Sequence, residues 1–242
     1  MPLTAHDVND RIIKAARLDR RIIAVCAQET VPEDAVTVRE ALREGNPCVA
    51  HALYSMSTDP SFPAIYVGEG GKGCCGGAQM WFGFKDFPLD VSGMFASESP
   101  DAMHIKASTE VSRRTLEDMG RFVPLGRYIV MRPLTTVEDL AQVRSILCFG
   151  TAGQMRDLAA MVHFGSSKAY LSITAPWGSG CATFVSYPSG MAVGAPRDTA
   201  FISPTNPEAE DWLPADTLAM GIPKDMAVRM AEGYEASFAS RR

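Results

Sequence analysis

The sequence predicts one α/β domain over residues 1–242, in which helices flank a layered, mixed and partly parallel sheet. Segments whose apolar residues recur at helical spacing alternate with short apolar segments that are typical of buried strands. The composition, with 46% hydrophobic and 21% charged residues, is that of an ordinary globular core and surface. The sequence shows no internal repeat, low-complexity tract or clear linker, so we expect a single domain.

The first half of the chain is predicted to begin with an amphipathic helix around residues 8–18, behind a cap at Thr4 or Asp7. Further strands are expected at 22–25 and 62–67, and further helices at 37–43, from Pro47 onward and from Cys74 onward. Pro47 is expected as the first residue of its helix, because proline has no backbone N–H to lose there.

The second half is predicted to continue the alternation of helices and strands. Helices are expected at 108–119, capped by Ser108, and at 136–142, 151–163 and 223–238. Strands are expected at 128–131, 145–149, 169–173 and 199–202. The proline-rich and acidic stretch 204–211 is interpreted as a surface loop rather than a domain boundary.

The charge pattern argues against nucleic acid and membrane partners. The net charge is −5 with a pI near 5.4, and runs of Lys and Arg are no longer than pairs; such a surface repels a phosphate backbone. Charged residues interrupt the first twenty positions, so no signal peptide is indicated. Apolar runs fall short of the length that spans a bilayer. We therefore expect a cytoplasmic protein, in which thiols stay reduced.

Four of the six cysteines, at three places in the sequence, share a local pattern. Asn-Pro-Cys48, Gly-Cys74-Cys75-Gly-Gly and Gly-Ser-Gly-Cys181 each place a cysteine where a loop is expected to enter a helix. A helix N-terminus favours the thiolate, which is the form that ligates metals and acts as a nucleophile. Adjacent glycines let the backbone approach a bulky inorganic group. The predicted cofactor-contacting glycines are Gly76, Gly77, Gly178 and Gly180.

The predicted metal ligands are Cys48, Cys75 and Cys181, with Cys74 as a candidate for a fourth. Neighbouring side chains diverge, so one ligand is expected from Cys74 and Cys75, and Cys75 is preferred. Three thiolates from separate loops suit an iron–sulfur cluster, most simply of the 4Fe–4S type, with one iron left for another ligand. His51 and Cys148 are the other candidates for that position. Structural zinc is disfavoured because two close Cys-x-x-Cys pairs are lacking.

Other chemically capable residues have simpler interpretations. Cys26 and Cys148 lie in apolar strands and are expected to fill space in the core. His51 follows Cys48 by three residues, so it is either a partner of that thiolate or a core-facing side chain. Met80, Trp81, Phe82 and Phe84 are interpreted either as core or as the wall of a ligand pocket.

The chain also resembles a family known as domain of unknown function 169, found in anaerobic bacteria and archaea. The segments that carry the resemblance are 130–134, 153–158, 178–181, 196–202 and 221–223, together with Pro47-Cys48 and Cys75-Gly76-Gly77-Ala78. The resemblance implies no established activity. It does imply that the family's recurring cysteines match Cys48, Cys75 and Cys181, and the anaerobic distribution suits an oxygen-sensitive cluster. Cys74 departs from the family's pattern.

Three functional hypotheses follow from the sequence. The first is an iron–sulfur or other metal-cluster protein with an adjacent small-molecule pocket and redox or Lewis-acid chemistry. The second is a metal-free thiol enzyme that uses Cys75 or Cys181 as nucleophile and Cys74 or Cys48 as resolving thiol. The third is a carrier or sensor of a small ligand without catalysis. A small molecule or a redox protein is the expected partner, and the sequence leaves homo-oligomerisation, the substrate and catalysis itself open.

Overall fold

The computed structural model describes residues 2–69, 71, 73–88, 91–203 and 212–242. These residues form an eight-stranded sheet in the order β2-β3-β4-β1-β5-β8-β7-β6. The strands are β1 (Ile23–Gln28), β2 (Ala35–Thr37), β3 (Ala64–Gly68), β4 (Tyr128–Pro133), β5 (Val143–Thr151), β6 (Ile173–Thr174), β7 (Ala200–Ser203) and β8 (Thr217–Pro223). Only the edge pairs β2–β3 and β6–β7 are parallel among these strands. The predicted mixed, partly parallel α/β sheet is confirmed.

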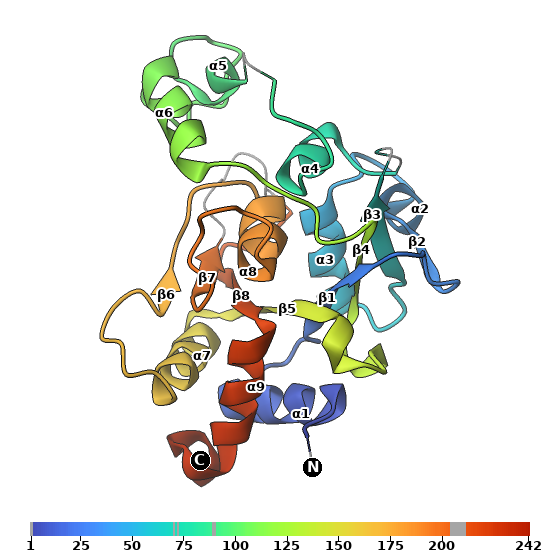
Figure 1. Ribbon diagram of the computed structural model, residues 1–242, viewed down its shortest axis with the longest axis vertical. Helices are drawn as coiled ribbons and strands as arrows, with labels where there is room; N and C mark the ends of the chain where they lie inside the picture. The colour runs from blue at the N-terminus through green and yellow to red at the C-terminus, as the bar shows by residue number, and fades with distance from the viewer. Residues whose placement is uncertain (1, 70, 72, 89–90, 204–211) are drawn as a thin grey trace.

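Helices cover both faces of this sheet (Figure 1). The α-helices are α1 (Ala5–Ala16), α2 (Val38–Leu42), α3 (Val49–Thr58), α4 (Gly76–Trp81), α5 (Ser92–Phe95), α6 (Thr109–Met119), α7 (Ala152–Phe164), α8 (Tyr187–Ser189) and α9 (Lys224–Gly233). A π-helix, η3 (Cys181–Ser186), runs directly into α8. Short 3₁₀ turns are η1 (Leu134–Thr136), η2 (Leu140–Gln142), η5 (Tyr234–Ala236) and η6 (Phe238–Arg241). Thr4 and Ser108 cap α1 and α6 as predicted.

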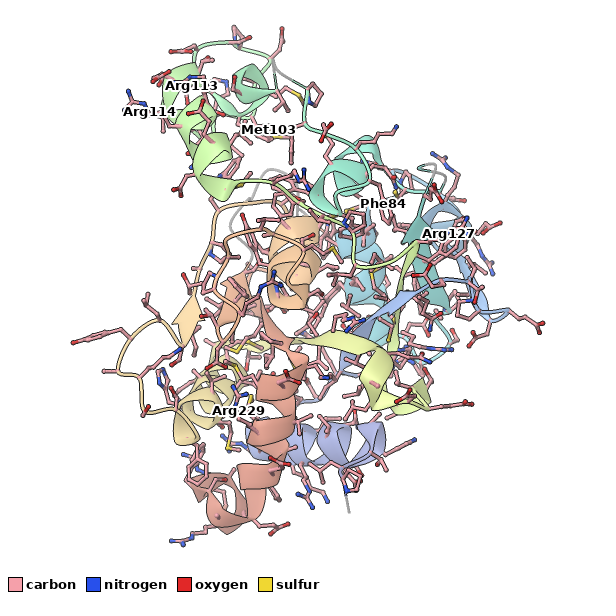
Figure 2. All side chains as sticks on the ribbon, viewed as in Figure 1. Phe84, Met103, Arg113, Arg114, Arg127 and Arg229 are labelled. Carbon is pink, nitrogen blue, oxygen red and sulfur yellow. The ribbon has the colours of Figure 1, made fainter. Side chains whose placement is uncertain are left out.

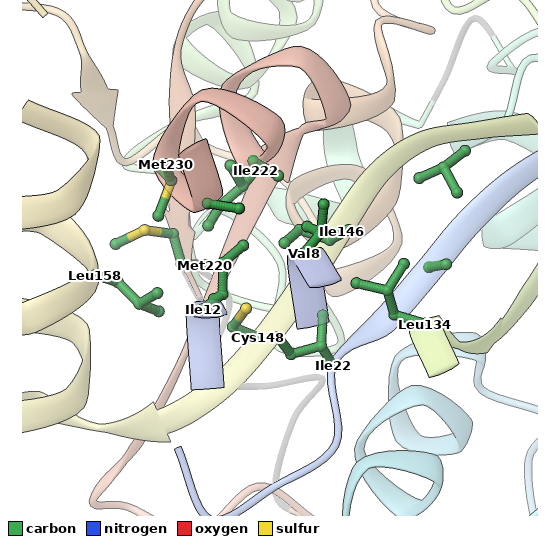
Figure 3. Close-up of a cluster of buried hydrophobic side chains, with 14 of the residues drawn as sticks. Val8, Ile12, Ile22, Leu134, Ile146, Cys148, Leu158, Met220, Ile222 and Met230 are labelled. Carbon is green, nitrogen blue, oxygen red and sulfur yellow. The ribbon is translucent and has the colours of Figure 1, made fainter. Parts of the chain in front are cut away.

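Alternation along the central strands divides the interior into two cores. In β1, Ala24 and Cys26 belong to the core under α1, α7 and α9, whereas Ile23 and Val25 belong to the core under α3, α4 and η3. Successive side chains of a strand point to opposite faces, so a strand covered on both sides must be apolar throughout. Figure 3 shows the first core, in which Ile146, Cys148 and Met220 meet side chains of α1, α7 and α9.

A small lobe of two helices stands away from the sheet. α5 and α6 lie side by side at the top of Figure 1, beyond α4. Figure 2 shows Met103 on the side of this lobe that faces α4, whereas Arg113 and Arg114 lie on its outer side. Met103 thus faces α4, and the partly exposed Arg113 and Arg114 face solvent.

The structure corrects several predicted elements. The expected helix 136–142 is replaced by the 3₁₀ turns η1 and η2, and the expected strand 169–173 is reduced to β6, with Tyr170 and Leu171 exposed before it. Strand β8, central to the sheet, was not predicted, because Gly221 and Pro223 are weak strand formers. The expected loop 204–211 lies outside the described residues. Within those that are described, no helix is long and apolar enough to cross a membrane.

One buried carboxylate ties three distant segments together beneath the first core. The side chain of Asp157 in α7 is only 3% exposed and forms ion pairs with Arg17 (2.6 Å), Arg242 (3.1 Å) and Arg156 (3.3 Å). Burial by itself raises the pKa of Asp157, but hydrogen bonds from the three guanidinium groups outweigh it and hold the pKa below its ordinary value. Asp157 thus joins the end of α1 and the C-terminus to α7.

Asp157→Asn is expected to lower the free energy of unfolding by about 2 kcal/mol at pH 7, because a neutral amide weakens charge-assisted hydrogen bonds. A lowered folded-state pKa stabilises the protein above the unfolded pKa of about 3.9 and loses that effect as the pH falls through the folded value. The difference between variant and wild type should therefore shrink below about pH 4. Urea denaturation, monitored by circular dichroism at several pH values, measures this difference in the free energy of unfolding.

The matched control is Asp225→Asn, whose carboxylate is 80% exposed and pairs with Lys224 at 3.2 Å. A solvent-exposed pair contributes less than about 1 kcal/mol. Equal destabilisation by the two variants would contradict a structural role for the Asp157 network.

Candidate functional site

A cavity of about 670 Å³ lies where α3, α4 and η3 begin, between the second core and the α5 segment of the lobe. Its lining combines thiols, aromatic rings and methionines with a few polar groups. The described lining residues are Glu44, Gly45, Asn46, Cys48, Ala50, His51, Cys75, Gly77, Ala78, Met80, Trp81, Phe87, Val91, Met94, Phe95, Met103, Trp177, Ser179, Gly180, Cys181 and Trp212. Residues from four separate stretches of the chain thus enclose one space.

Cys48 and Cys75 reach the cavity from the first turns of two helices. Cys48 is the N-cap of α3 and Cys75 is the N-cap of α4. The backbone N–H of Cys75 donates to the carbonyl of Pro47 at 3.1 Å, which holds the two cysteine-bearing segments side by side. The predicted position of both cysteines at a loop-to-helix junction is confirmed. Pro47 itself was wrongly predicted as helical, because α3 begins only at Val49.

Cys181 enters the same cavity from the opposite half of the sequence. It is the first residue of the π-helix η3, follows Gly180 directly and is 5% exposed. The hydroxyl of Ser186, one turn further, donates to the carbonyl of Trp81 at 2.6 Å. This bond fixes η3 against α4, so Cys181 lies on the wall that also carries Cys75.

The cavity includes most of the predicted site residues but not all of them. Gly77 and Gly180 belong to its lining, whereas Gly76, Gly178 and Cys74 do not. The Cys74 sulfur instead accepts a hydrogen bond from Gln79 Nε2 at 2.9 Å. Burial raises the pKa of the Cys74 thiol, and the hydrogen bond from Gln79 only partly opposes that rise. Cys74 and Cys75 therefore diverge, as expected of neighbouring side chains.

The other cysteines lie in the first core, on the far face of the sheet from the cavity. Cys26 and Cys148 are both about 1% exposed there. Burial raises the pKa of Cys26 to about 11 and that of Cys148 to about 12. Cys148 as a fourth ligand was therefore wrong, because strand alternation directs Leu147 and Phe149, and not Cys148, toward the core beside the cavity.

The spacing of the thiols bears on which metal centre they could hold. Among the residues described, no three Cys, His, Asp or Glu side chains are grouped closely enough to hold one metal ion. Ligands of a four-iron cluster bind different irons, so they are spaced more widely than the ligands of one ion. Cys48, Cys75 and Cys181 supply this cavity with three sulfur donors, which is the donor type that iron–sulfur clusters use.

Aromatic rings form much of the remaining wall, and only some of them were predicted from the sequence. Trp81 lines the cavity, whereas Phe82 is fully buried in the core, so both interpretations of that stretch apply. His51 stacks on Trp212, with ring centroids 5.4 Å apart and planes inclined by 16°. Trp177 packs edge-on against Phe95 at 5.1 Å. Trp177 was not predicted as a site residue, although it precedes Cys181 by four positions.

The loop before η3 is held in place by a buried tyrosine. The Tyr187 hydroxyl donates to the carbonyl of Trp177 at 3.1 Å. Burial, and to a lesser degree the charge of Asp118, raises the pKa of Tyr187 to about 12, so the hydroxyl keeps its proton at neutral pH. On its outer side the Trp177 ring lies 4.5 Å from the ammonium of Lys106, whose pKa is lowered by burial.

The fold and the cavity define an α/β protein with a pocket lined by thiols and aromatic rings. The chain belongs to the DUF169 family, described as Uncharacterised ArCR, whose model matches residues 11–233. The resemblance predicted from the sequence is thereby confirmed. No curated protein and no solved structure matches the chain.

The rate of alkylation is expected to differ between the cysteine that lines the cavity and the cysteines buried on the other face of the sheet. Cys75 is partly exposed and lines the cavity, whereas Cys26 and Cys148 are buried with raised pKa values. Since the thiolate is the reactive form, brief treatment of the native protein with iodoacetamide at pH 8 should modify Cys75 at least about 100-fold faster than either buried thiol. Peptide mass spectrometry gives the rates. Urea-unfolded protein, in which all six should react alike, is the control, and comparable native rates would contradict the assignment.

Proposed function

We propose that the protein binds an iron–sulfur cluster through Cys48, Cys75 and Cys181 and accommodates a small molecule beside it. One observation carries the proposal: three cysteines from distant parts of the sequence line the same cavity. Thiolates are the usual ligands of such clusters. A 4Fe–4S cluster is the simplest form, because three thiolates bind three irons and leave the fourth accessible.

The fourth ligand position has one candidate on the cavity wall. His51 lies one turn after Cys48 in α3 and lines the cavity, unlike Cys74 or Cys148. Either His51 or the small molecule itself would face the remaining iron. A bound cluster supplies electron transfer or, at an iron without a protein ligand, Lewis acidity. The protein's part is to hold the thiolates apart at a fixed spacing and to present His51.

The apolar walls support the same proposal. Trp81, Phe95 and Met80 place apolar side chains around the same space as the cysteines. A hydrophobic surround controls solvent access to a metal centre and tunes its redox potential. Reduced thiols of this kind are maintained in a reducing compartment, so we place the protein in the cytoplasm, with a small molecule or a redox protein as its partner.

A metal-free thiol enzyme is the second candidate. The hydrogen bond from Cys75 N–H to the Pro47 carbonyl brings the Cys75 and Cys48 segments together, as a nucleophile and a resolving thiol require. In such an enzyme two thiols would lose two electrons and two protons to a disulfide substrate and form one disulfide. Iron-free protein that forms a Cys48–Cys75 disulfide with oxidised dithiothreitol would favour this candidate over the cluster.

Anaerobic reconstitution with ferrous iron and sulfide tests the cluster directly. Wild-type protein is expected to retain about four iron and four sulfide per chain after desalting, with a brown colour. Cys48→Ser, Cys75→Ser and Cys181→Ala should each lose most of the bound iron, because each removes a ligand. Iron and acid-labile sulfide assays measure the outcome.

Cys148→Ala is the matched control for Cys181→Ala, since both remove a buried thiol but only Cys181 lines the cavity. The control should retain wild-type iron content, and circular dichroism shows whether each variant is folded. Folded wild-type protein that binds no iron, or cavity variants that bind as much as wild type, would overturn the proposal.

A further inference from the structure

The protein concentrates its tryptophans in the candidate site. The chain contains three, Trp81, Trp177 and Trp212, and all three line the cavity. Trp212 stacks face to face with His51, while Trp81 and Trp177 meet edge to face with centroids 6.3 Å apart. Indole rings present broad, flat, rigid faces, and aromatic groups pack well against other flat rings. The walls therefore favour a planar, largely apolar guest.

Three hydrogen-bond donors of the same cavity lack partners. The indole nitrogens of Trp177 and Trp212 and the hydroxyl of Ser179 are buried, and none has a hydrogen-bond partner in the part of the chain that the structure describes. A buried donor left unpaired costs about 1 to 3 kcal/mol. An indole N–H can only donate, so its partner must be an acceptor.

Two hydroxyl groups directly behind the cavity wall do have hydrogen-bond partners. The hydroxyls of Ser186 and Tyr187, directly behind the wall, both donate to main-chain carbonyls. Buried donors without a partner also occur outside the cavity among the described residues, at Arg21, Ser112 and Arg132, but three of the unpaired donors line this one cavity. Glu44 is the only carboxylate among the described lining residues, and the Lys106 ammonium lies against the outer face of Trp177. The surroundings therefore accept an uncharged or an anionic acceptor group.

We infer that the organic ligand of the cavity is a planar, mainly apolar ring compound carrying a carbonyl or carboxylate, whose oxygens accept hydrogen bonds from Trp177, Trp212 and Ser179. This inference rests on the proposed function only in taking the same cavity as the binding site, and it does not require the cluster. The rings fix the plane of the ligand, and the donors fix its orientation.

Four probe compounds test separately whether binding requires a planar ring and whether it requires a hydrogen-bond acceptor. 2-Naphthoate and 2-acetylnaphthalene are planar and carry an acceptor, 2-methylnaphthalene is planar without one, and decalin-2-carboxylate carries an acceptor on a non-planar body. Quenching of tryptophan fluorescence, checked by titration calorimetry, gives the affinities. The first two probes are expected to bind at least about tenfold more tightly than either of the others. Equal affinity for all four would overturn the inference.

Variants test the donors one at a time. Trp177→Phe and Trp212→Phe keep an aromatic ring but remove the N–H, and Ser179→Ala removes the hydroxyl. Each variant should lower the affinity for 2-naphthoate by about tenfold and change the affinity for 2-methylnaphthalene by less than about threefold. Tyr170→Phe, which removes a hydroxyl from a ring that is 81% exposed and outside the lining, is the matched control and should change neither.

The measurements are made on anaerobically reconstituted protein and on the same protein without added iron. Selective 2-naphthoate binding without iron uptake supports the inference while the cluster proposal fails. Iron uptake together with equal affinities for probes with and without an acceptor overturns the inference, while the cluster proposal stands. The same holds if the variants weaken binding of 2-methylnaphthalene as much as binding of 2-naphthoate. The comparison of probes on wild-type protein remains decisive if a tryptophan variant does not fold.

Discussion

The structure depends on the double burial of its central strands. β1 and β5 pair with each other and are covered on both faces, so consecutive side chains must enter different cores. Ile23 and Val25 pack on one side and Ala24 and Cys26 on the other. A shift of the register by one residue would exchange the two sets and expose each core to the wrong helices. The alternation therefore supplies one apolar surface for α1, α7 and α9 and another for α3, α4 and η3.

The candidate site lies on the face of the sheet that carries the second core. The segments that begin α3, α4 and η3 all cover the second core, and two short links hold them together: Cys75 N–H to the Pro47 carbonyl, and the Ser186 hydroxyl to the Trp81 carbonyl. Three thiols therefore share a wall although Cys48 and Cys181 lie far apart in the sequence. Strand alternation in β1 and β5 sends Cys26 and Cys148 to the opposite face of the sheet.

The cavity contains both thiol groups and hydrogen-bond donors that lack partners among the described residues. Its thiols suit soft metal ligation, and its unpaired indole and hydroxyl donors suit an oxygen acceptor. Protein interiors rarely leave buried donors unpaired, so these donors support the proposed acceptor group, as the thiols support the proposed cluster. Met94 and Phe95 of the α5 segment line the same space, so they add apolar surface beside both kinds of ligand.

The sequence alone determined the α/β class, the cap at Ser108, a cap of α1 at either Thr4 or Asp7, and the position of the three cysteines where loops enter helices, because each depends on contacts within a few residues. Only the tertiary structure decided that these cysteines share one cavity, that Trp177 and Trp212 line this cavity, and that Cys148 faces away from it. The place of β8 inside the sheet was likewise decided by the tertiary structure. A continuous apolar run does not reveal which residues face which core. Strand partners and cavity walls come from segments far apart in the chain, whose pairing depends on how the whole sheet folds.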